Sequence, residues 1–254
     1  MIFVQQVLRQ LYQKSLSVTI AVKKEMEVFF IKKELFNNWC KTAWLKCGLL
    51  ISALMIVLIL VNWNSWSTAL KCIAAVAALI PVHATEEWIF PGGFAYQYNL
   101  FLNSSDYPKA YPMNRASDMI TVLGTTVMYA LLVLYFAVTE TPVPSGVLLG
   151  ATGFSVLEVS VHTYFGIRAY GKFKNKGKTT IYGTGSVSAY TCFLPLGCIM
   201  IWQITVQKFS VTDLGWCVAV LGIISVLVFV PEAKLKDTNS PYAYQNSGYY
   251  ERFL

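Results

Sequence analysis

The chain has 254 residues, of which 56% are hydrophobic and only 13% are charged. Soluble domains carry roughly a quarter charged residues, so a soluble protein of this length would lack the charge to cover its surface. The net charge of +7 does not indicate a nucleic-acid partner, because the basic residues stand beside apolar segments, as membrane topology signals do. The composition therefore excludes an ordinary soluble domain and predicts an integral membrane protein.

Six apolar stretches each have close to the ~20 residues that cross about 30 Å of hydrocarbon. In chain order they cover residues 48–63, 68–88, 118–138, 143–164, 184–207 and 214–230. We therefore expect an all-α fold, a polytopic membrane helix bundle with about six transmembrane helices. This transmembrane domain would occupy residues 48–231.

The two ends of the chain have a different composition from the spans. Residues 1–47 mix apolar side chains with lysines, as an amphipathic segment does, and the part from 17 to 37 could form a helix. That helix would either lie on the inner membrane surface, attracted to anionic lipid, or pack against the protein or a partner. The tail, 232–254, is polar and rich in tyrosine, and we expect it to be mobile.

Basic residues are concentrated in alternate connections between the predicted spans. They precede the first span and occupy the second connection, the fourth connection and the tail, whereas the first and third connections contain none. Because cytoplasmic loops carry an excess of Lys and Arg, this alternation places both termini in the cytoplasm. The sequence thus predicts a multi-pass protein in contact with membrane lipids.

Two short groups of polar residues lie inside the predicted spans, where a charged side chain costs about 2.5–3.5 kcal/mol. In His83-Ala84-Thr85-Glu86-Glu87, both carboxylates can share a helix face with the imidazole, since positions i+3 and i+4 are neighbours on a helix. Glu158 and His162 form a second pair at i, i+4. With the predicted orientation, both groups lie toward the cytoplasmic ends of their spans.

These residues resemble a known family, the HXXEE-domain membrane proteins. The likeness rests on His83, Glu86 and Glu87, on the following Trp88 and the Pro-Gly-Gly-Phe turn of 91–94, and on a later histidine in an apolar helix. A turn leading into a further span, 182–188, is also similar, although Gly183, Thr184 and Ser188 replace the residues usual in the family. The resemblance covers roughly residues 70–197. It implies an integral membrane protein with a binding or active site, and it supplies no reaction.

Two imidazoles with carboxylates are a workable ligand set for zinc, iron or manganese. We predict a membrane-embedded enzyme with a cytoplasm-facing site that acts on a lipid-like or amphiphilic substrate. The predicted catalytic residues are His83, Glu86, Glu87 and His162, with Glu86 or Glu87 as general base. The predicted metal ligands are His83, Glu87, Glu158 and His162, and the predicted substrate-binding residues are Asn114, Arg115, Asp118 and Tyr182.

Four alternatives remain open at this point. The site could carry out acid–base chemistry without a metal, or the polar residues could form a hydrogen-bond network that only holds helix ends together. Buried Glu and His also serve as relays in ion- or proton-coupled transporters, but no internal repeat is evident and only Thr125, Thr126, Thr152 and Ser155 supply polar groups in the other half of the spans. The chain could finally be a non-catalytic scaffold that binds a partner through its N-terminal segment or its tail.

Overall fold

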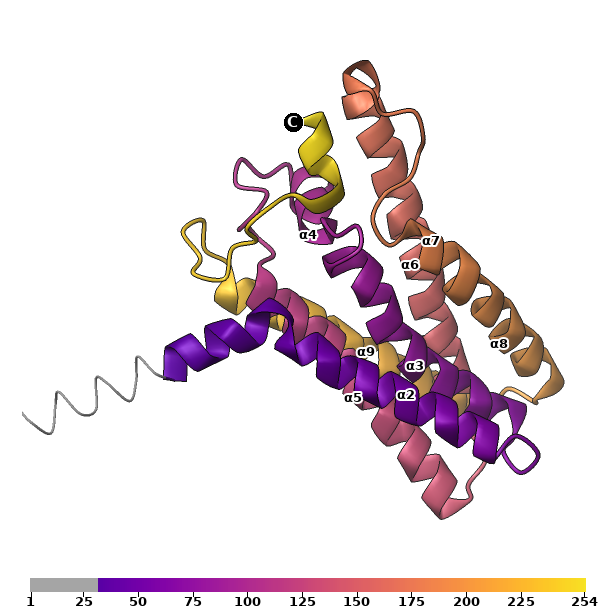
Figure 1. Cartoon of the computed structure of the whole chain (residues 1–254). Coiled ribbons are helices and arrows are strands. Elements are labelled where there is room, and N and C mark those ends of the chain that lie inside the picture. Colours follow the sequence, from indigo (N-terminus) through magenta and orange to yellow (C-terminus); the bar gives the residue numbers. More distant parts are fainter. Residues whose placement is uncertain (1–31) are drawn as a thin grey trace, which may run out of the picture.

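The computed structural model describes residues 32–254, and within that range it is a bundle of helices without strands (Figure 1). Six helices are long and apolar enough to cross a membrane, which confirms the predicted number. Four of them carry a single label each: α3 (Thr68–Trp88), α5 (Arg115–Thr139), α6 (Ser145–Phe173) and α9 (Val211–Leu235). The first spanning helix, Lys32–Val61, contains the π-helical turn η1 (Trp39–Ala43) and α2 (Trp44–Val61). The fifth, Ser186–Val206, contains α7 (Ser186–Ser188), η4 (Ala189–Phe193) and α8 (Leu194–Val206). The short elements are α4 (Phe94–Gln97), η2 (Tyr98–Leu102), η3 (Lys174–Lys176) and η5 (Gly248–Phe253).

The helix boundaries differ from the predicted spans where helices continue beyond their apolar stretches. The first spanning helix runs unbroken from Lys32, so the predicted division at residue 47 is not a break in the structure. α6 continues to Phe173, nine residues past the predicted end at 164. Hydropathy marks the part of a helix that suits hydrocarbon, whereas backbone hydrogen bonding lets the helix extend into the polar region. Most of the predicted amphipathic N-terminal segment lies outside the described residues.

α3 occupies the centre of the bundle and packs against α2, α5, α6 and α8. Its buried face is rich in alanine, which lets neighbouring backbones approach closely, as is common between helices in membranes. Gly48 of α2 faces Pro81 of α3, and a Cβ at Gly48 would lie 3.1 Å from the Cβ of Pro81. Close packing around α3 therefore fixes the position of the polar residues at its C-terminal end.

Side-chain caps define where several helices begin. Ser67 accepts a hydrogen bond from the backbone N–H of Leu70 at the start of α3. Asn114 and Ser117 form a capping box at the start of α5, and Ser210 and Asp213 form another at the start of α9. Such caps satisfy backbone N–H groups that have no partner within the helix. They set the register of the helices relative to the connecting loops.

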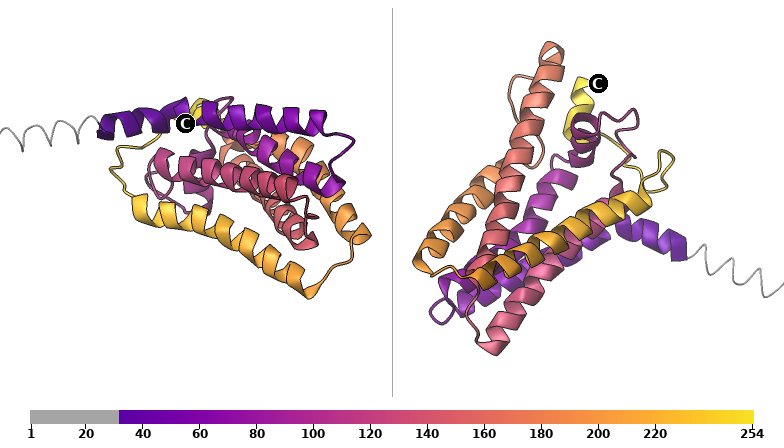
Figure 2. Two further views of the ribbon diagram at one scale, coloured as in Figure 1. Left: turned by 90° about the horizontal axis from the view of Figure 1, so that it is seen from below. Right: turned by 180° about the vertical axis from the view of Figure 1, so that it is seen from behind.

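The loops with basic residues gather at one end of the bundle, as the six-span topology requires. Asn37 contacts Arg115, Lys109 pairs with Glu251 of the tail at 3.6 Å, and Lys176 donates to the carbonyl of Leu254. The three connections without many charges meet at the opposite end, where residues from Asn62 to Ser67, from Glu140 to Val143 and Gln207 line one cavity. Figure 2 shows these two ends in two further views.

The prediction of a mobile tail is wrong. Tyr250 is fully buried, and it packs with Phe165 and Phe173 of α6 and with Phe101 in a small aromatic core. The tail also contacts the turn that follows α3, where Tyr249 N donates to the carbonyl of Gly92 at 3.0 Å. Polar composition suggested mobility, but the tyrosine rings provide apolar surface that docks between α4 and the end of α6.

The turn after α3 can receive the tail only because glycines stand on both sides of the contact. Gly93 has a φ of 107°, and a Cβ there would lie 2.5 Å from the carbonyl oxygen of Ser247. Gly248 has a φ of 56° and faces the backbone of Gly92. Any side chain at these positions would push the two backbone segments apart. The Pro-Gly-Gly-Phe turn is thus the docking point of the C-terminal segment.

Candidate metal centre

Four of the predicted site residues meet between α3 and α6. His83 and Glu87 come from the C-terminal part of α3, and Glu158 and His162 come from the middle of α6. One ligand atom from each of the four residues lies within 4.8 Å of the other three. Both histidines and Glu87 are buried, while the side chain of Glu158 is 20% exposed. The structure therefore brings together the whole set that was predicted to bind a metal.

Helical spacing and helix packing each contribute one part of this arrangement. Within α3 and within α6, the histidine and the glutamate are four residues apart and therefore lie on one face. The pairs point at each other because α3 and α6 pack side by side. Their order along the chain is opposite, since the histidine precedes the glutamate on α3 and follows it on α6. Each imidazole consequently faces the carboxylates of both helices.

The distances among the four ligand atoms are nearly equal. Each histidine Nε2 lies 3.3 Å from Glu87 Oε1 and 3.3 Å from Glu158 Oε2. The two Nε2 atoms are 3.1 Å apart. Four ligands about 2.0 Å from one tetrahedral zinc ion lie about 3.3 Å from one another. Five of the six separations thus match the edges of a zinc tetrahedron, and the sixth, between the carboxylates, does not exceed 4.8 Å.

The hydrogen bonds of Ser188 determine which nitrogen of His83 carries a proton. The Ser188 hydroxyl donates to Glu86 Oε2 at 2.5 Å, and its oxygen lies 2.7 Å from His83 Nδ1. A hydroxyl has one proton to donate, so the Nδ1–H of His83 must donate to Ser188. With Nδ1 as the donor to Ser188, a neutral ring would direct the lone pair of Nε2 toward Glu87, Glu158 and His162. Metal-binding histidines are commonly oriented in this way by a hydrogen bond on the other nitrogen.

Glu86 faces away from the four-residue cluster and accepts four hydrogen bonds. Its Oε1 accepts from the Tyr182 hydroxyl at 3.0 Å and from Val187 N at 3.1 Å, and its Oε2 accepts from the backbone and the hydroxyl of Ser188. Both oxygens are occupied, which leaves this carboxylate poorly placed to act as a general base. We assign it a positioning role, in which it holds the start of α7 and, through Ser188, the ring of His83.

A comparison with protein-family models matches residues 74–201, about half of the chain, to the family described as proteins of unknown function with an HXXEE motif. The chain belongs to the HXXEE family. The matched region contains most of α3, all of α5, α6 and α7 and part of α8, and therefore all four clustered residues. No curated protein and no solved structure matches the chain. The three letters of the HXXEE motif thus have distinct contacts here: His83 and Glu87 face α6, and Glu86 faces α7.

Two residues of the turn before α7 complete the surroundings of the HXXEE motif. Tyr182 donates to Glu86, and burial together with the charge of Glu86 raises the pKa of Tyr182, which keeps its hydroxyl protonated as a donor. Gly185 has a φ of 88° and lies flat against the His162 ring, where a Cβ would overlap the imidazole. Sequence reasoning missed Gly185 and Ser188 as site residues, although both belong to the turn on which the family resemblance partly rested.

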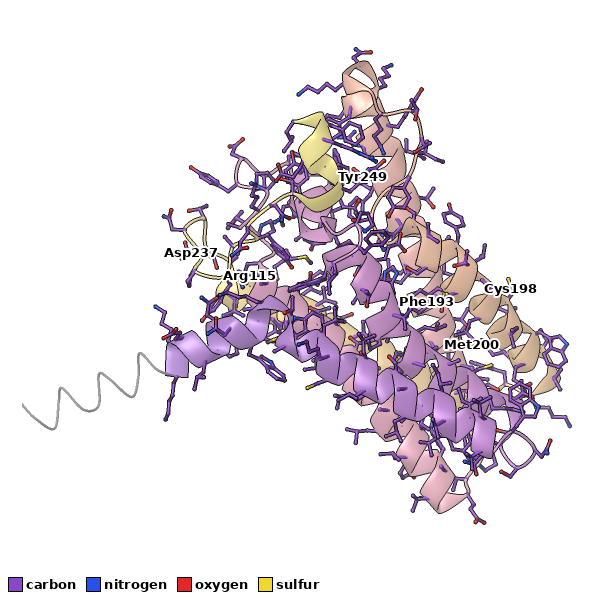
Figure 3. All side chains as sticks on the ribbon, viewed as in Figure 1. Arg115, Phe193, Cys198, Met200, Asp237 and Tyr249 are labelled. Atoms are coloured by element: carbon purple, nitrogen blue, oxygen red, sulfur yellow. The ribbon has the colours of Figure 1, made fainter. Side chains whose placement is uncertain are left out.

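The other three residues predicted to bind substrate hold helix ends and the tail. Asn114 caps α5 and donates to the carbonyl of Leu235 at 2.8 Å. The Nε of Arg115 donates to the carbonyls of Ala243 and Tyr242, and Nη2 donates to Asn37 and to the carbonyl of Pro241. Figure 3 shows Arg115 beside the C-terminal segment. Asp118 accepts a hydrogen bond of 2.8 Å from Tyr244. The network interpretation thus suits Glu86, Arg115 and Asp118, whereas the four-residue cluster is distinct from it.

Proposed function

We propose that this HXXEE protein is a membrane-embedded metalloenzyme that binds one divalent metal ion between α3 and α6 and acts on an amphiphilic substrate. The observation that supports it most directly is the packing of four ligand atoms, two nitrogens and two carboxylate oxygens, with five of their six separations at 3.1–3.3 Å. Zinc fits these separations best, and iron and manganese accept the same ligand types. The predicted topology would turn the site toward the cytoplasm.

Electrostatics favours a divalent cation at the centre. Two ionised carboxylates with two neutral imidazoles carry a charge of about −2 in a low-dielectric interior, where an unneutralised charge is very costly. Two protonated imidazoles that donate to Glu87 and Glu158 would also balance this charge, but they would hold two positive charges on nitrogens 3.1 Å apart. Two like charges at so short a distance disfavour each other's ionised form. A divalent ion neutralises the carboxylates and uses both nitrogen lone pairs.

The exposures of the two glutamates suggest different roles for them. His83, His162 and Glu87 form a two-histidine, one-glutamate set of the kind that holds catalytic zinc in metallopeptidases. Glu158 has the most exposed side chain of the four, so it is the residue that water would reach most easily. In this assignment Glu158 accepts the proton of the attacking water. A zinc ion held by these residues would lower the pKa of such a water to about 7.

Metal analysis of the purified protein tests the binding part of the proposal. We expect close to one metal ion per chain by plasma mass spectrometry, and loss of that metal in both His83→Ala and His162→Ala. Thr125→Ala is the matched control, because Thr125 is buried in the same bundle but donates only to the carbonyl of Thr121 on its own helix. Folded protein that was never exposed to chelator and still contains no metal would contradict the proposal.

The catalytic part is tested by separating metal content from turnover. Wild-type protein in proteoliposomes of native lipid extract would be compared with Glu158→Gln and Glu87→Gln, and lipid products would be followed by mass spectrometry. We expect Glu158→Gln to keep most of its metal and lose product formation, whereas Glu87→Gln loses both. Product formation that survives in Glu158→Gln would show that Glu158 is not the base. Equal product formation by metal-free protein would show that the reaction does not need the metal.

A further inference from the structure

Two cavities lie one behind the other in the seam between α6 and the η4–α8 segment. The upper cavity, about 360 Å³, is bordered by two residues of α6 and six of the segment 181–191: His162, Thr163, Ile181, Tyr182, Ser186, Val187, Tyr190 and Thr191. The lower cavity, about 130 Å³, is bordered by four residues of α6 and five of the η4–α8 segment: Ser155, Val156, Val159, Ser160, Phe193, Leu194, Gly197, Cys198 and Ile201. The two helical segments run in opposite directions, so the cavities follow each other along a single seam. The positions from 163 to 155 span about 12 Å of helix.

The seam runs directly past the four-residue cluster. His162 is part of the upper cavity's lining, and Phe193, which borders the lower cavity, contacts the His83 ring with centroids 5.3 Å apart. Figure 3 labels Phe193 at the α3 side of this segment and Cys198 at the outer side of α8. A molecule in the seam would therefore lie along one side of the proposed metal centre.

The outer rim of the seam is apolar and belongs to the surface that faces lipid in a spanning bundle. Ile181 and Val187 at the upper cavity are 60% and 56% exposed, and Leu194 and Ile201 at the lower cavity are 44% and 50% exposed. A lipid chain can thus enter sideways from the bilayer without crossing water. The lower cavity is slightly smaller than an engineered cavity of about 150 Å³ that holds one benzene molecule. It therefore suits a single slim chain and excludes fused ring systems.

We propose that the α6–α8 seam binds one acyl chain of an amphiphile, with the polar end of that molecule in the upper cavity. The orientation follows from depth: the upper cavity adjoins the turn before α7 at the polar end of the bundle, and the lower cavity lies farther into the spans. Five hydroxyl-bearing residues border the upper cavity, and two, Ser155 and Ser160, border the lower one. As a substrate site this binding rests on the proposed function, because the polar end would lie beside His162.

Photolabelling tests the seam independently of any turnover. The probe is palmitic acid with a diazirine at mid-chain, added to full-length protein in phosphatidylcholine nanodiscs, with labelled peptides mapped by mass spectrometry. We expect labels to concentrate on residues 155–160 and 193–201 and to be displaced by excess palmitic acid but not by cholesterol. Cys198→Trp, which fills the lower cavity from an exposed position, should reduce seam labelling severalfold. Val218→Trp, on the lipid-facing side of α9 and 70% exposed, should leave it unchanged.

The same samples separate this proposal from the metal site. Labels spread evenly over the lipid-facing residues of α2 and α9, or seam labelling that excess palmitic acid or Cys198→Trp does not reduce, would overturn the acyl-chain site. Displacement by cholesterol would overturn the restriction to a slim chain. Metal content is measured in parallel on each sample. Absence of metal would contradict the proposed function, whereas the labelling pattern alone decides whether the seam binds an acyl chain.

Discussion

The Nε2 atoms of His83 and His162 lie 3.1 Å apart, although the two residues are separated by 79 positions in the chain. Glu87 and Glu158 each contact both nitrogens at 3.3 Å. This one relationship between α3 and α6 links the stability of the bundle to whatever occupies the centre.

Metal removal should destabilise the wild-type protein and reverse the effect of a carboxylate substitution. A ligand that binds only the folded state at 1,000 times its Kd adds about 4 kcal/mol, so chelation should lower Tm clearly. In the chelated protein, Glu158→Gln should raise Tm relative to chelated wild type, because it removes one of two unneutralised buried carboxylates. In the metal-loaded protein the same substitution should lower Tm. Thermal scans of both proteins with and without chelator would show this crossing, and a substitution effect of the same sign in both states would contradict it.

Ser188→Ala should weaken metal binding without abolishing it. The substitution removes the acceptor of His83 Nδ1–H and the hydroxyl that donates to Glu86. Loss of such an outer partner typically costs 10–100-fold in metal affinity. Ser188→Thr retains the hydroxyl and should restore most of the affinity, measured by competition with a metal chelator of known strength. Equal metal affinities for the Ala and Thr variants would show that the Ser188 hydroxyl does not orient His83.

Gly185→Ala and Gly177→Ala should differ strongly although both glycines have positive φ angles, 88° and 91°. A Cβ at Gly185 overlaps the His162 ring, whereas a Cβ at Gly177 meets no atom within 4 Å. Both variants carry the backbone strain of about 1–2 kcal/mol for a left-handed residue, but only Gly185→Ala displaces a proposed ligand. We expect Gly177→Ala to keep its metal and Gly185→Ala to lose it. Similar metal contents in the two variants would show that the close contact between Gly185 and the His162 ring does not control metal binding.

Tyr250→Ala should release the C-terminal segment. The ring is fully buried against Phe173 and Phe101, and the hydroxyl donates to Gln97. Removal of a buried aromatic side chain typically costs about 3–5 kcal/mol. We expect trypsin to cleave much faster after Lys234 and Lys236, and Tyr107→Ala, at a residue 56% exposed, to leave the cleavage rate unchanged. Unaltered cleavage in Tyr250→Ala would mean that other contacts hold the tail.

Tyr249 should ionise at a lower pH than an ordinary tyrosine. Partial burial raises its pKa, but hydrogen bonding and charge from Lys178 and Arg252 outweigh burial and lower the pKa overall. Because the folded pKa is lowered, the stabilisation from this ionisation is present above the unfolded pKa of about 10 and is lost as the pH falls through the folded value. In a spectrophotometric titration, Tyr249→Phe should remove the earliest phenolate signal. Tyr250→Phe should not, because burial raises the pKa of Tyr250.

Much of the architecture could be predicted from local sequence properties. Apolar stretches determine the number of spans because burial in hydrocarbon depends on each segment by itself. The alternation of basic loops predicted which connections share an end of the bundle, and the contacts of Lys109, Lys176 and Asn37 agree with it. Spacing of four residues also predicted that His83 lies beside Glu87 and Glu158 beside His162, since that is a property of one helix.

Tertiary structure alone decided the rest. Glu86 and Glu87 are adjacent and chemically identical, and only the packing of α3 between α6 and α7 turns Glu87 toward the histidines and Glu86 toward Ser188. The docking of Tyr250 likewise depends on a surface formed by α4, η2 and α6, which no stretch of the tail encodes. The sequence by itself determined the helices and the residue pairs on each, because those follow from short-range periodicity. Which faces meet is set by the fit between helices far apart in the chain.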